Sequence, residues 1–353
     1  MRLYAKLSVS YWNFDTFTPS KITREKNMLT LFRTNQPLAN ILLLFYLGIL
    51  RASSFIHPAT VAPPPQGILT AWMYAELPPL SITANIAAFM LVFFQATALN
   101  ITIARYRVAT EISLLPGVFY CLFTCLMPDF MVLSSVLLAN TFVILALFYL
   151  FDTYKNSYVA GRIFDAGLWL GVASLFHFSY VLFIIWGIIG LGILRGLRGK
   201  EFLMFLIGYT VPFFLLGVYC YWHDILPQIG NHFRNNINFF SFTRYDSPTL
   251  YVKIGVIALI LLLTVGASTQ FFSRRNMTVQ KYLSILYWLI LLGGFSVLIQ
   301  TGVGLVQLLA IAVPVGTLLS MVFQRISAAT AEALHMLFLM VALILQFEYL
   351  LIN

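Results

Sequence analysis

Long apolar runs dominate this sequence from Leu38 to its last residues, and short polar stretches separate them. Hydrophobic residues make up 60% of the 353 residues, whereas Asp, Glu, Lys and Arg together make up 9%. A water-soluble protein of this length needs far more polar surface. A helix that crosses a bilayer needs about 20 apolar residues. The sequence therefore predicts an all-α fold, a polytopic bundle of transmembrane helices.

About eleven helices are expected, with the N-terminus in the cytoplasm and the C-terminus external. Residues 1–35 are too polar for a span and are expected to form a basic cytoplasmic leader. Residues 36–353 are expected to form a single transmembrane domain, with external loops at about 56–80 and 223–248. The apolar segments cover about 38–56, 82–104, 112–127, 131–151, 163–178, 180–195, 202–222, 249–270, 282–300, 302–323 and 330–351.

The stretch from Ile163 to Arg195 decides this count. As one helix its 33 residues would be about 50 Å long, which is too long for one span and short for two. A single span would also reverse the side of every later loop and weaken the charge bias described next. A hairpin of two short helices is therefore expected, with its turn near His177–Tyr180. Asp165 would then lie at the cytoplasmic end beside Arg162.

Lysine and arginine are biased to one side of this topology, as the cytoplasmic loops of membrane proteins require. The net charge of +9 is then explained by loops that face anionic lipid rather than by nucleic-acid binding. The external side holds four of the 21 basic residues: Arg51, Arg234, Arg244 and Lys253. The cytoplasmic side holds the other 17: Arg2, Lys6, Lys21, Arg24, Lys26, Arg33, Arg105, Arg107, Lys155, Arg162, Arg195, Arg198, Lys200, Arg274, Arg275, Lys281 and Arg325.

Four acidic residues on the external side are candidates for catalysis, because ionisable groups near hydrocarbon are costly and are often functional. Glu76 lies in the first external loop and Asp129 in a short turn between two apolar segments. Asp224 and Asp246 lie in the largest external loop. Each of the four could serve as a base in a transfer reaction.

Four other side chains are candidates for binding a lipid phosphate: Arg51, Arg234, Arg244 and His177. Arg51 follows thirteen apolar residues from Leu38, so it is expected near the external third of the first helix. A guanidinium there could bind phosphate through two hydrogen bonds. The alternative for Arg51 is that its side chain extends to the interface, and the alternative for His177 is an interfacial or hydrogen-bonded core histidine.

The sequence carries no motif for a nucleotide, a metal or another cofactor. The stretch "TGVGLVQ" matches a glycine motif only in spacing and lies between apolar segments. Glu332 and His335 share one helix face, but one such pair supplies at most two metal ligands. Cys121, Cys125 and Cys220 have no metal-ligand spacing. The expected partners are the lipid bilayer, an anionic or polyprenyl-linked lipid, and a second membrane protein.

Two stretches resemble known proteins. "MLTLFRTNQPLANILLLFYLGIL", from Met28, and "RIFDAGLWLGVASLFHFSYVLFIIWGIIGLGILRGLRGKEFLMFLIGYTVPFFL", from Arg162, lie within about residues 28–222. This region resembles a little-characterised family of multi-pass inner-membrane proteins of Bacteroidota. The resemblance implies a location in the bacterial inner membrane and no established activity, with residues 1–27 as an extension. The middle is more distantly similar to multi-pass glycosyltransferases that use polyprenyl-phosphate sugars. Those enzymes carry one or two acids in their first external loop, where this chain has Glu76 alone.

Three kinds of function stay open at this point. The first is the handling of lipid-linked sugars or other anionic lipids in envelope biogenesis, which would include a glycosyltransferase. The second is a non-catalytic scaffold or partner subunit, favoured by aromatic and glycine-containing helix faces such as that of Gly167 and Gly171, whose spacing permits close packing. The third is a transporter or flippase, for which Gly293–Gly294 and Pro314 would break helices.

Overall fold

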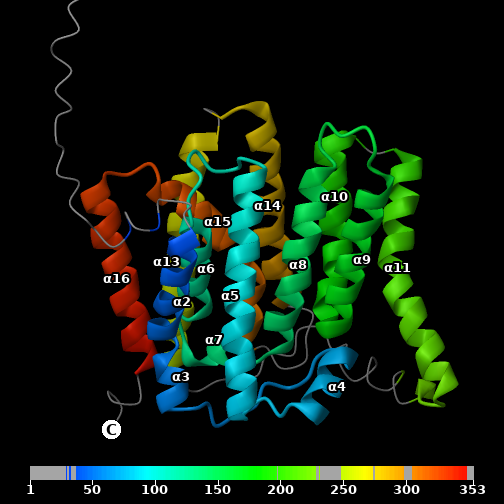
Figure 1. Cartoon of the computed structure of the whole chain (residues 1–353), viewed down its shortest axis with the longest axis horizontal. Coiled ribbons are helices and arrows are strands. Elements are labelled where there is room, and N and C mark those ends of the chain that lie inside the picture. The colour runs from blue at the N-terminus through cyan, green and yellow to red at the C-terminus, as the bar shows by residue number, and fades with distance from the viewer. Residues whose placement is uncertain are drawn as a thin grey trace, which may run out of the picture.

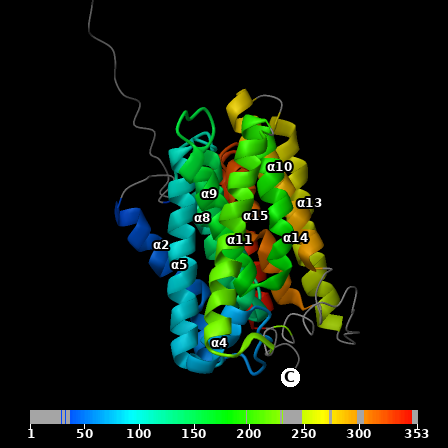
Figure 2. The same cartoon turned by 90° about the vertical axis from the view of Figure 1, so that its right-hand side faces the viewer.

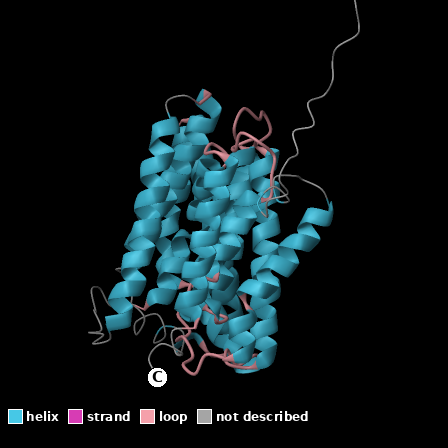
Figure 3. Ribbon diagram, turned by 90° about the vertical axis from the view of Figure 1, so that its left-hand side faces the viewer, coloured by secondary structure: helices cyan, strands magenta, loops and turns pink. Residues whose placement is uncertain are grey.

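The computed structural model describes residues 37–196, 198–227, 248–272, 275–297 and 304–347, together with Leu29, Phe32 and Gly230. Within these residues every regular element is a helix, and no strand is present (Figure 1, Figure 3). In chain order the elements are α2 (Pro37–Leu50), α3 (Ala52–Ile56), α4 (Ile68–Glu76), α5 (Ile82–Arg105), α6 (Leu115–Thr124), α7 (Pro128–Met131), α8 (Ser135–Asp152), α9 (Ala160–Phe176), η1 (Phe178–Leu182), α10 (Phe183–Arg195), α11 (Gly199–Trp222), α13 (Pro248–Phe272), α14 (Met277–Ser296), η3 (Leu305–Ile311), α15 (Ala312–Phe323) and α16 (Ala328–Gln346).

Eight helical stretches within the described residues are long and apolar enough to cross a membrane. They are α5, α8, η1 with α10, α11, α13, α14, η3 with α15, and α16. The protein is therefore a multi-pass integral membrane protein with an all-helical fold. Helices α2, α6 and α9 run among these spans but have only 14, 10 and 17 residues. The expected total of about eleven spans remains a prediction.

Helices α6 and α15 form the centre of the bundle. Every residue of α6 is buried, and 78% of the apolar window that contains α15 is buried. The rings of Phe119 and Phe323 pack with their centroids 4.4 Å apart. In contrast, only 28% of the corresponding window of α11 and 22% of that of α13 are buried. Helices α11 and α13 therefore lie at the outside of the bundle, as does α16, whose window is also 28% buried (Figure 2).

The predicted hairpin is present. Helix α9 ends at Phe176, and η1 turns the chain into α10. At the far end of α10, Arg195 Nη1 donates to the carbonyls of Thr153 and Asn156, 2.9 Å away in each case. Those residues connect α8 to the start of α9, so α10 has returned to the end at which α9 began. The start of α9 differs from expectation in one contact, because Arg162 pairs with Asp152 (Nε–Oδ2 3.0 Å) and not with Asp165.

Polar side chains inside the bundle join helices that are distant in sequence. Tyr120 donates its hydroxyl to Gln95 Oε1 over 2.7 Å, and Gln95 Nε2 donates to the Leu137 carbonyl over 2.7 Å. Tyr180 donates to Asn140 Oδ1 over 2.6 Å, and Asn140 Nδ2 donates to the Leu309 carbonyl over 2.8 Å. The first series of hydrogen bonds connects α5, α6 and α8, and the second connects η1, α8 and η3. In hydrocarbon the protein alone can satisfy such groups.

Glycines bring α9 and α11 into backbone contact, as the spacing of Gly167 and Gly171 predicts. A Cβ atom at Gly167 would meet the carbonyl of Phe205, and one at Gly171 would meet that of Tyr209. From the other side, a Cβ at Gly208 would meet the carbonyl of Phe164. Both helices therefore supply small residues to one interface, which is the usual way for transmembrane helices to pack closely.

The two ends of the bundle differ in charge. One end, here the α7 end, holds residues 51–81, 125–134 and 177–182; the other, here the basic end, holds residues 105–114, 152–160, 195–200, 275–277 and 324–328 (Figure 1). Among the described basic residues, the α7 end holds Arg51 and Lys253. The basic end holds Arg105, Arg107, Lys155, Arg162, Arg195, Arg198, Lys200, Arg275, Lys281 and Arg325.

The charge difference predicts which end faces the cytoplasm. Thr60, in the α7 end, and Ser157, in the basic end, are exposed, whereas the three native cysteines are buried. A single cysteine can therefore be introduced at either position and labelled. We expect a membrane-impermeant maleimide to label intact cells at position 60 and to label position 157 only after the membrane is opened. The reverse pattern would show that the α7 end is cytoplasmic.

The glycine contact predicts a selective loss of stability. We expect Gly208→Ala to lower the free energy of unfolding by about 1–3 kcal/mol, because the added methyl group meets a backbone carbonyl that has no rotamer to change. Gly217→Ala in the same helix is the matched control, since no atom lies within 4 Å of a Cβ there. Melting of the purified variants, followed by intrinsic fluorescence, measures both. Equal melting temperatures would contradict the close packing of α9 against α11.

Candidate functional site

The α7 end is covered by the segment between α3 and α5, which contains the short helix α4. Helix α4 lies across the bundle at this end (Figure 2). Thr70 donates its hydroxyl to the Phe176 carbonyl over 2.8 Å, and Tyr74 donates to the Leu133 carbonyl over 2.7 Å. A Cβ at Gly67 would meet the same Phe176 carbonyl, so glycine lets the loop approach the end of α9. The sequence predicted an external loop at about 56–80 here and missed the helix α4 within it.

Two neighbouring cavities lie beneath this loop. The first, of about 260 Å³, is bounded by α3, the start of α5, α7 and the end of α16. The second, of about 580 Å³, lies between residues 59–66, the start of α8, α13 and η3. Ala59, Pro128 and Val132 line both cavities. The short helix α7 therefore forms the wall between them.

Arg51 lies behind the first cavity and is completely buried, with 0% of its surface exposed. It stands at the break between α2 and α3, where the sequence predicted one continuous segment. Its Nη2 atom donates to the Met131 carbonyl and, over 3.5 Å, to Asn85 Oδ1. Its Nε and Nη1 atoms have no hydrogen-bond partner, and no carboxylate of the described residues lies within ion-pair distance. The side chain does not reach the interface, and no described residue compensates its charge.

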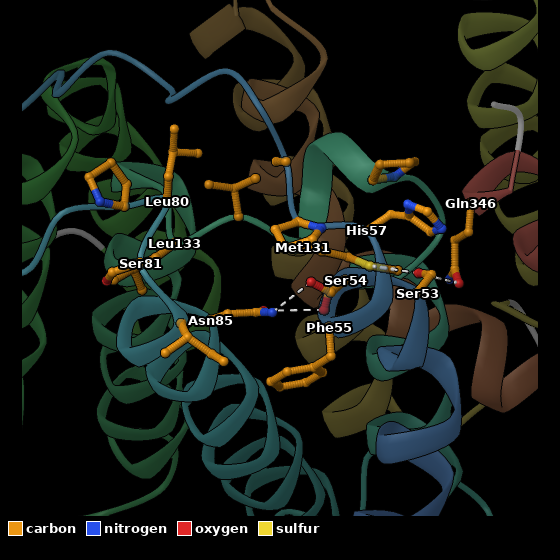
Figure 4. Close-up of a pocket in the computed structure, with 16 residues that line it drawn as sticks. Ser53, Ser54, Phe55, His57, Leu80, Ser81, Asn85, Met131, Leu133 and Gln346 are labelled. Atoms are coloured by element: carbon orange, nitrogen blue, oxygen red, sulfur yellow. Dashed lines mark hydrogen bonds between the residues drawn. The ribbon is translucent and has the colours of Figure 1, made fainter.

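The wall of the first cavity on this side is a network of amides and hydroxyls. Asn85 Nδ2 donates to the Ser54 carbonyl over 2.9 Å, and the Ser54 hydroxyl donates to Asn85 Oδ1 over 3.2 Å. The Ser53 hydroxyl donates to Gln346 Oε1 over 3.0 Å. Figure 4 shows Asn85 directed at Ser54, and Ser53 between Met131 and Gln346. Sequence reasoning missed Ser53, Ser54 and Asn85, because uncharged polar residues near helix ends give no distinctive pattern.

An ion pair lines the second cavity. Lys253 Nζ, on α13, lies 3.1 Å from Asp129 Oδ2, on α7. His177 lines the same cavity, and its Nδ1 atom lies 3.1 Å from the Ser135 hydroxyl oxygen. The ring is buried, with 1% exposed, which agrees with the reading of a hydrogen-bonded core histidine and still places it at a cavity wall. Lys253 was counted as an external cation in the sequence but was not selected, although a lysine inside an apolar helix is itself a signal.

The structure brings together only part of the predicted set. Arg51 lies beside the first cavity, and Asp129 and His177 line the second. Glu76 and Asp224 are exposed and line neither cavity. Asp246, Arg234 and Arg244 lie outside the described residues.

Glu332 and His335, the pair considered as metal ligands, have other contacts. His335 Nε2 lies 3.0 Å from the Tyr46 hydroxyl oxygen, and Glu332 Oε2 accepts a hydrogen bond from the Leu29 backbone nitrogen over 3.0 Å. Across the part of the chain that the structure describes, no group of three or more His, Cys, Asp or Glu side chains is placed to hold a metal ion.

Comparison with protein-family models, with curated proteins and with solved structures finds no match to this chain.

The buried Arg51 and the partly buried Arg195 are expected to respond oppositely to mutation. Arg51→Met should leave the melting temperature unchanged or raise it, because it removes a buried charge with two unsatisfied atoms while keeping similar volume. Arg195→Met should lower the free energy of unfolding by about 1–3 kcal/mol. Arg195 bonds both oxygens of Glu201 at 3.0–3.1 Å and two carbonyls, all of which would lose their donor. Thermal unfolding in detergent compares the two, and a large loss for Arg51→Met would mean that Arg51 is a structural residue.

Proposed function

We propose that this membrane protein binds the anionic group of a lipid in the first cavity of the α7 end. The observation that carries the proposal is the uncompensated charge of Arg51 beside that cavity. A buried cation without a counter-ion is unfavourable, and such residues in membrane proteins mark ligand or ion sites. An anion in the cavity would supply the missing charge.

The electrostatic effect acts across the cavity wall, because Arg51 itself is fully buried. Asn85 and Ser54 line the cavity, and an anion there would accept a hydrogen bond from the second amide N–H of Asn85. It would also accept one from the Ser54 hydroxyl once that proton turns away from the Arg51 carbonyl and Asn85 Oδ1. At a separation of about 8 Å and an effective dielectric constant of about 20, the guanidinium would stabilise a unit negative charge by about 2 kcal/mol. Salt screens this interaction little, because the pair is buried.

The surroundings of the cavity suit a ligand with an apolar tail. Phe55, Leu80 and Ile82 line the cavity, and their side chains are 42%, 42% and 70% exposed. Apolar side chains at the rim of a membrane bundle face lipid, so an acyl or polyprenyl chain could leave the cavity between α3 and α5 without entering water. The charge and the rim together favour a membrane lipid over a free anion.

Lipid-linked sugars and other anionic lipids of a bacterial inner membrane fit this description, in line with the resemblance of residues 28–222. Of the four candidate acids, Asp129 alone among the described ones lines a cavity. A transferase reaction would therefore depend on Asp129 as its base. A flippase would use the same cavity as its external site.

Native mass spectrometry of the protein extracted with its own lipids tests the proposal. We expect the wild type to retain an anionic lipid, and Arg51→Met to bind it about 30-fold more weakly, which is the effect of about 2 kcal/mol. Arg198→Met is the matched control, because it removes the same charge from an exposed site at the basic end. Retention of only bulk phospholipid by all three proteins, with a second protein in the complex, would favour the scaffold instead.

A further inference from the structure

We propose that the two cavities form one bipartite site for an anionic lipid whose head group carries an uncharged, hydroxyl-rich part beyond the phosphate. The phosphate would occupy the first cavity and the uncharged part the second. This inference rests on the proposed function and names the class of lipid.

The two cavities adjoin. Both are lined by Ala59, Pro128 and Val132, so a group in the first cavity lies next to the second. The second cavity has more than twice the volume of the first, about 580 Å³ against about 260 Å³. A tail that leaves past Phe55 and Ile82 would orient the head group toward α7 and the larger space. The order along the ligand is then tail, phosphate, head group.

The lining of the second cavity selects an uncharged polar group. Asp129 and Lys253 lie 3.1 Å apart, so together they add no net charge to the wall. Apart from His177, the other polar side chains among the described residues that line it are hydroxyls and amides, namely Thr60, Ser134, Ser135, Gln66 and Gln307. Hydroxyls and amides each donate and accept hydrogen bonds, and a ligand with many hydroxyl groups does the same. A second phosphate or an amine would have to compete with this ion pair for one of its two members.

The two cavities therefore divide the recognition. The first selects by charge, through Arg51, and the second by hydrogen bonding to a head group of sufficient size. A lipid that ends at its phosphate would leave the polar wall of the second cavity to water. Such a lipid would keep the electrostatic attraction to Arg51 and would lack the hydrogen bonds to the second cavity.

Binding of three lipids with matched acyl chains tests this division on the full-length protein in detergent. The lipids are phosphatidylinositol, with an uncharged polyol head group, phosphatidic acid, with none, and phosphatidylethanolamine, with a cationic one. Native mass spectrometry with stepwise addition of each lipid gives the dissociation constants. We expect phosphatidylinositol to bind at least about tenfold more tightly than each of the other two.

Two variants assign the preference to the second cavity. The double variant Asp129→Asn with Lys253→Met keeps that cavity neutral and removes its ion pair. Ala62→Phe instead adds a bulky side chain to the second cavity, which Ala62 lines while it does not line the first, and it leaves the ion pair in place. Ala62 is exposed, so this variant serves if the double variant does not fold. Each variant is expected to lower the affinity for phosphatidylinositol to that for phosphatidic acid and to leave the affinity for phosphatidic acid unchanged.

The outcomes distinguish a failure of the bipartite site from a failure of the proposed anionic lipid site. Equal binding of phosphatidylinositol and phosphatidic acid to the wild type, with both weakened by Arg51→Met, would overturn the bipartite site and keep the anionic site. Tighter binding of phosphatidylethanolamine than of phosphatidylinositol would overturn the uncharged head group. No effect of Arg51→Met on either anionic lipid would remove the proposed function itself.

Discussion

Inside a membrane, a polar group can hydrogen-bond only to the protein or to what the protein holds, and this constraint governs most of the bundle. The side chains of Gln95, Tyr120 and Asn140 each find a partner on another helix. These bonds fix how the central helices stand relative to one another. Six described residues keep buried side-chain atoms without a hydrogen-bond partner, and Arg51 is the one among them with two such atoms, Nε and Nη1.

The position of Arg51 links the fold to the proposed site. It interrupts the first long apolar helix, so that α3 begins directly after it and brings Ser53 and Ser54 to the cavity. Its contact with the Met131 carbonyl holds it against α7, the helix that separates the two cavities. The residue that carries the charge therefore also touches the wall through which the two halves of the site meet.

The sequence predicted the class of fold and the hairpin for physical reasons that hold in any membrane protein. Apolar runs of span length and the bias of basic residues depend on the bilayer alone. The 33 residues from Ile163 to Arg195 are too many for one span, so the sequence predicted two short helices joined by a turn. The break at Arg51 and the helix α4 were not predicted, because both depend on tertiary partners: the Met131 carbonyl in one case and the Phe176 and Leu133 carbonyls in the other. The same distinction applies to the site. Arg51, Asp129 and His177 stood out as ionisable groups in an apolar sequence. Asn85 and Ser54 could be recognised as residues of the site only from the placement of α3, α5 and α7 around the first cavity. Lys253 gave a signal that was available and not used.

The central claim is that an anion compensates the charge of Arg51, and a structure in lipid tests it most directly. Electron cryomicroscopy of the protein in nanodiscs that contain anionic lipid would show what lies in the first cavity. The account predicts phosphate density against Asn85 and Ser54, with a tail that leaves between α3 and α5. A carboxylate of the protein in contact with the Arg51 guanidinium, and no lipid density in the cavity, would contradict it.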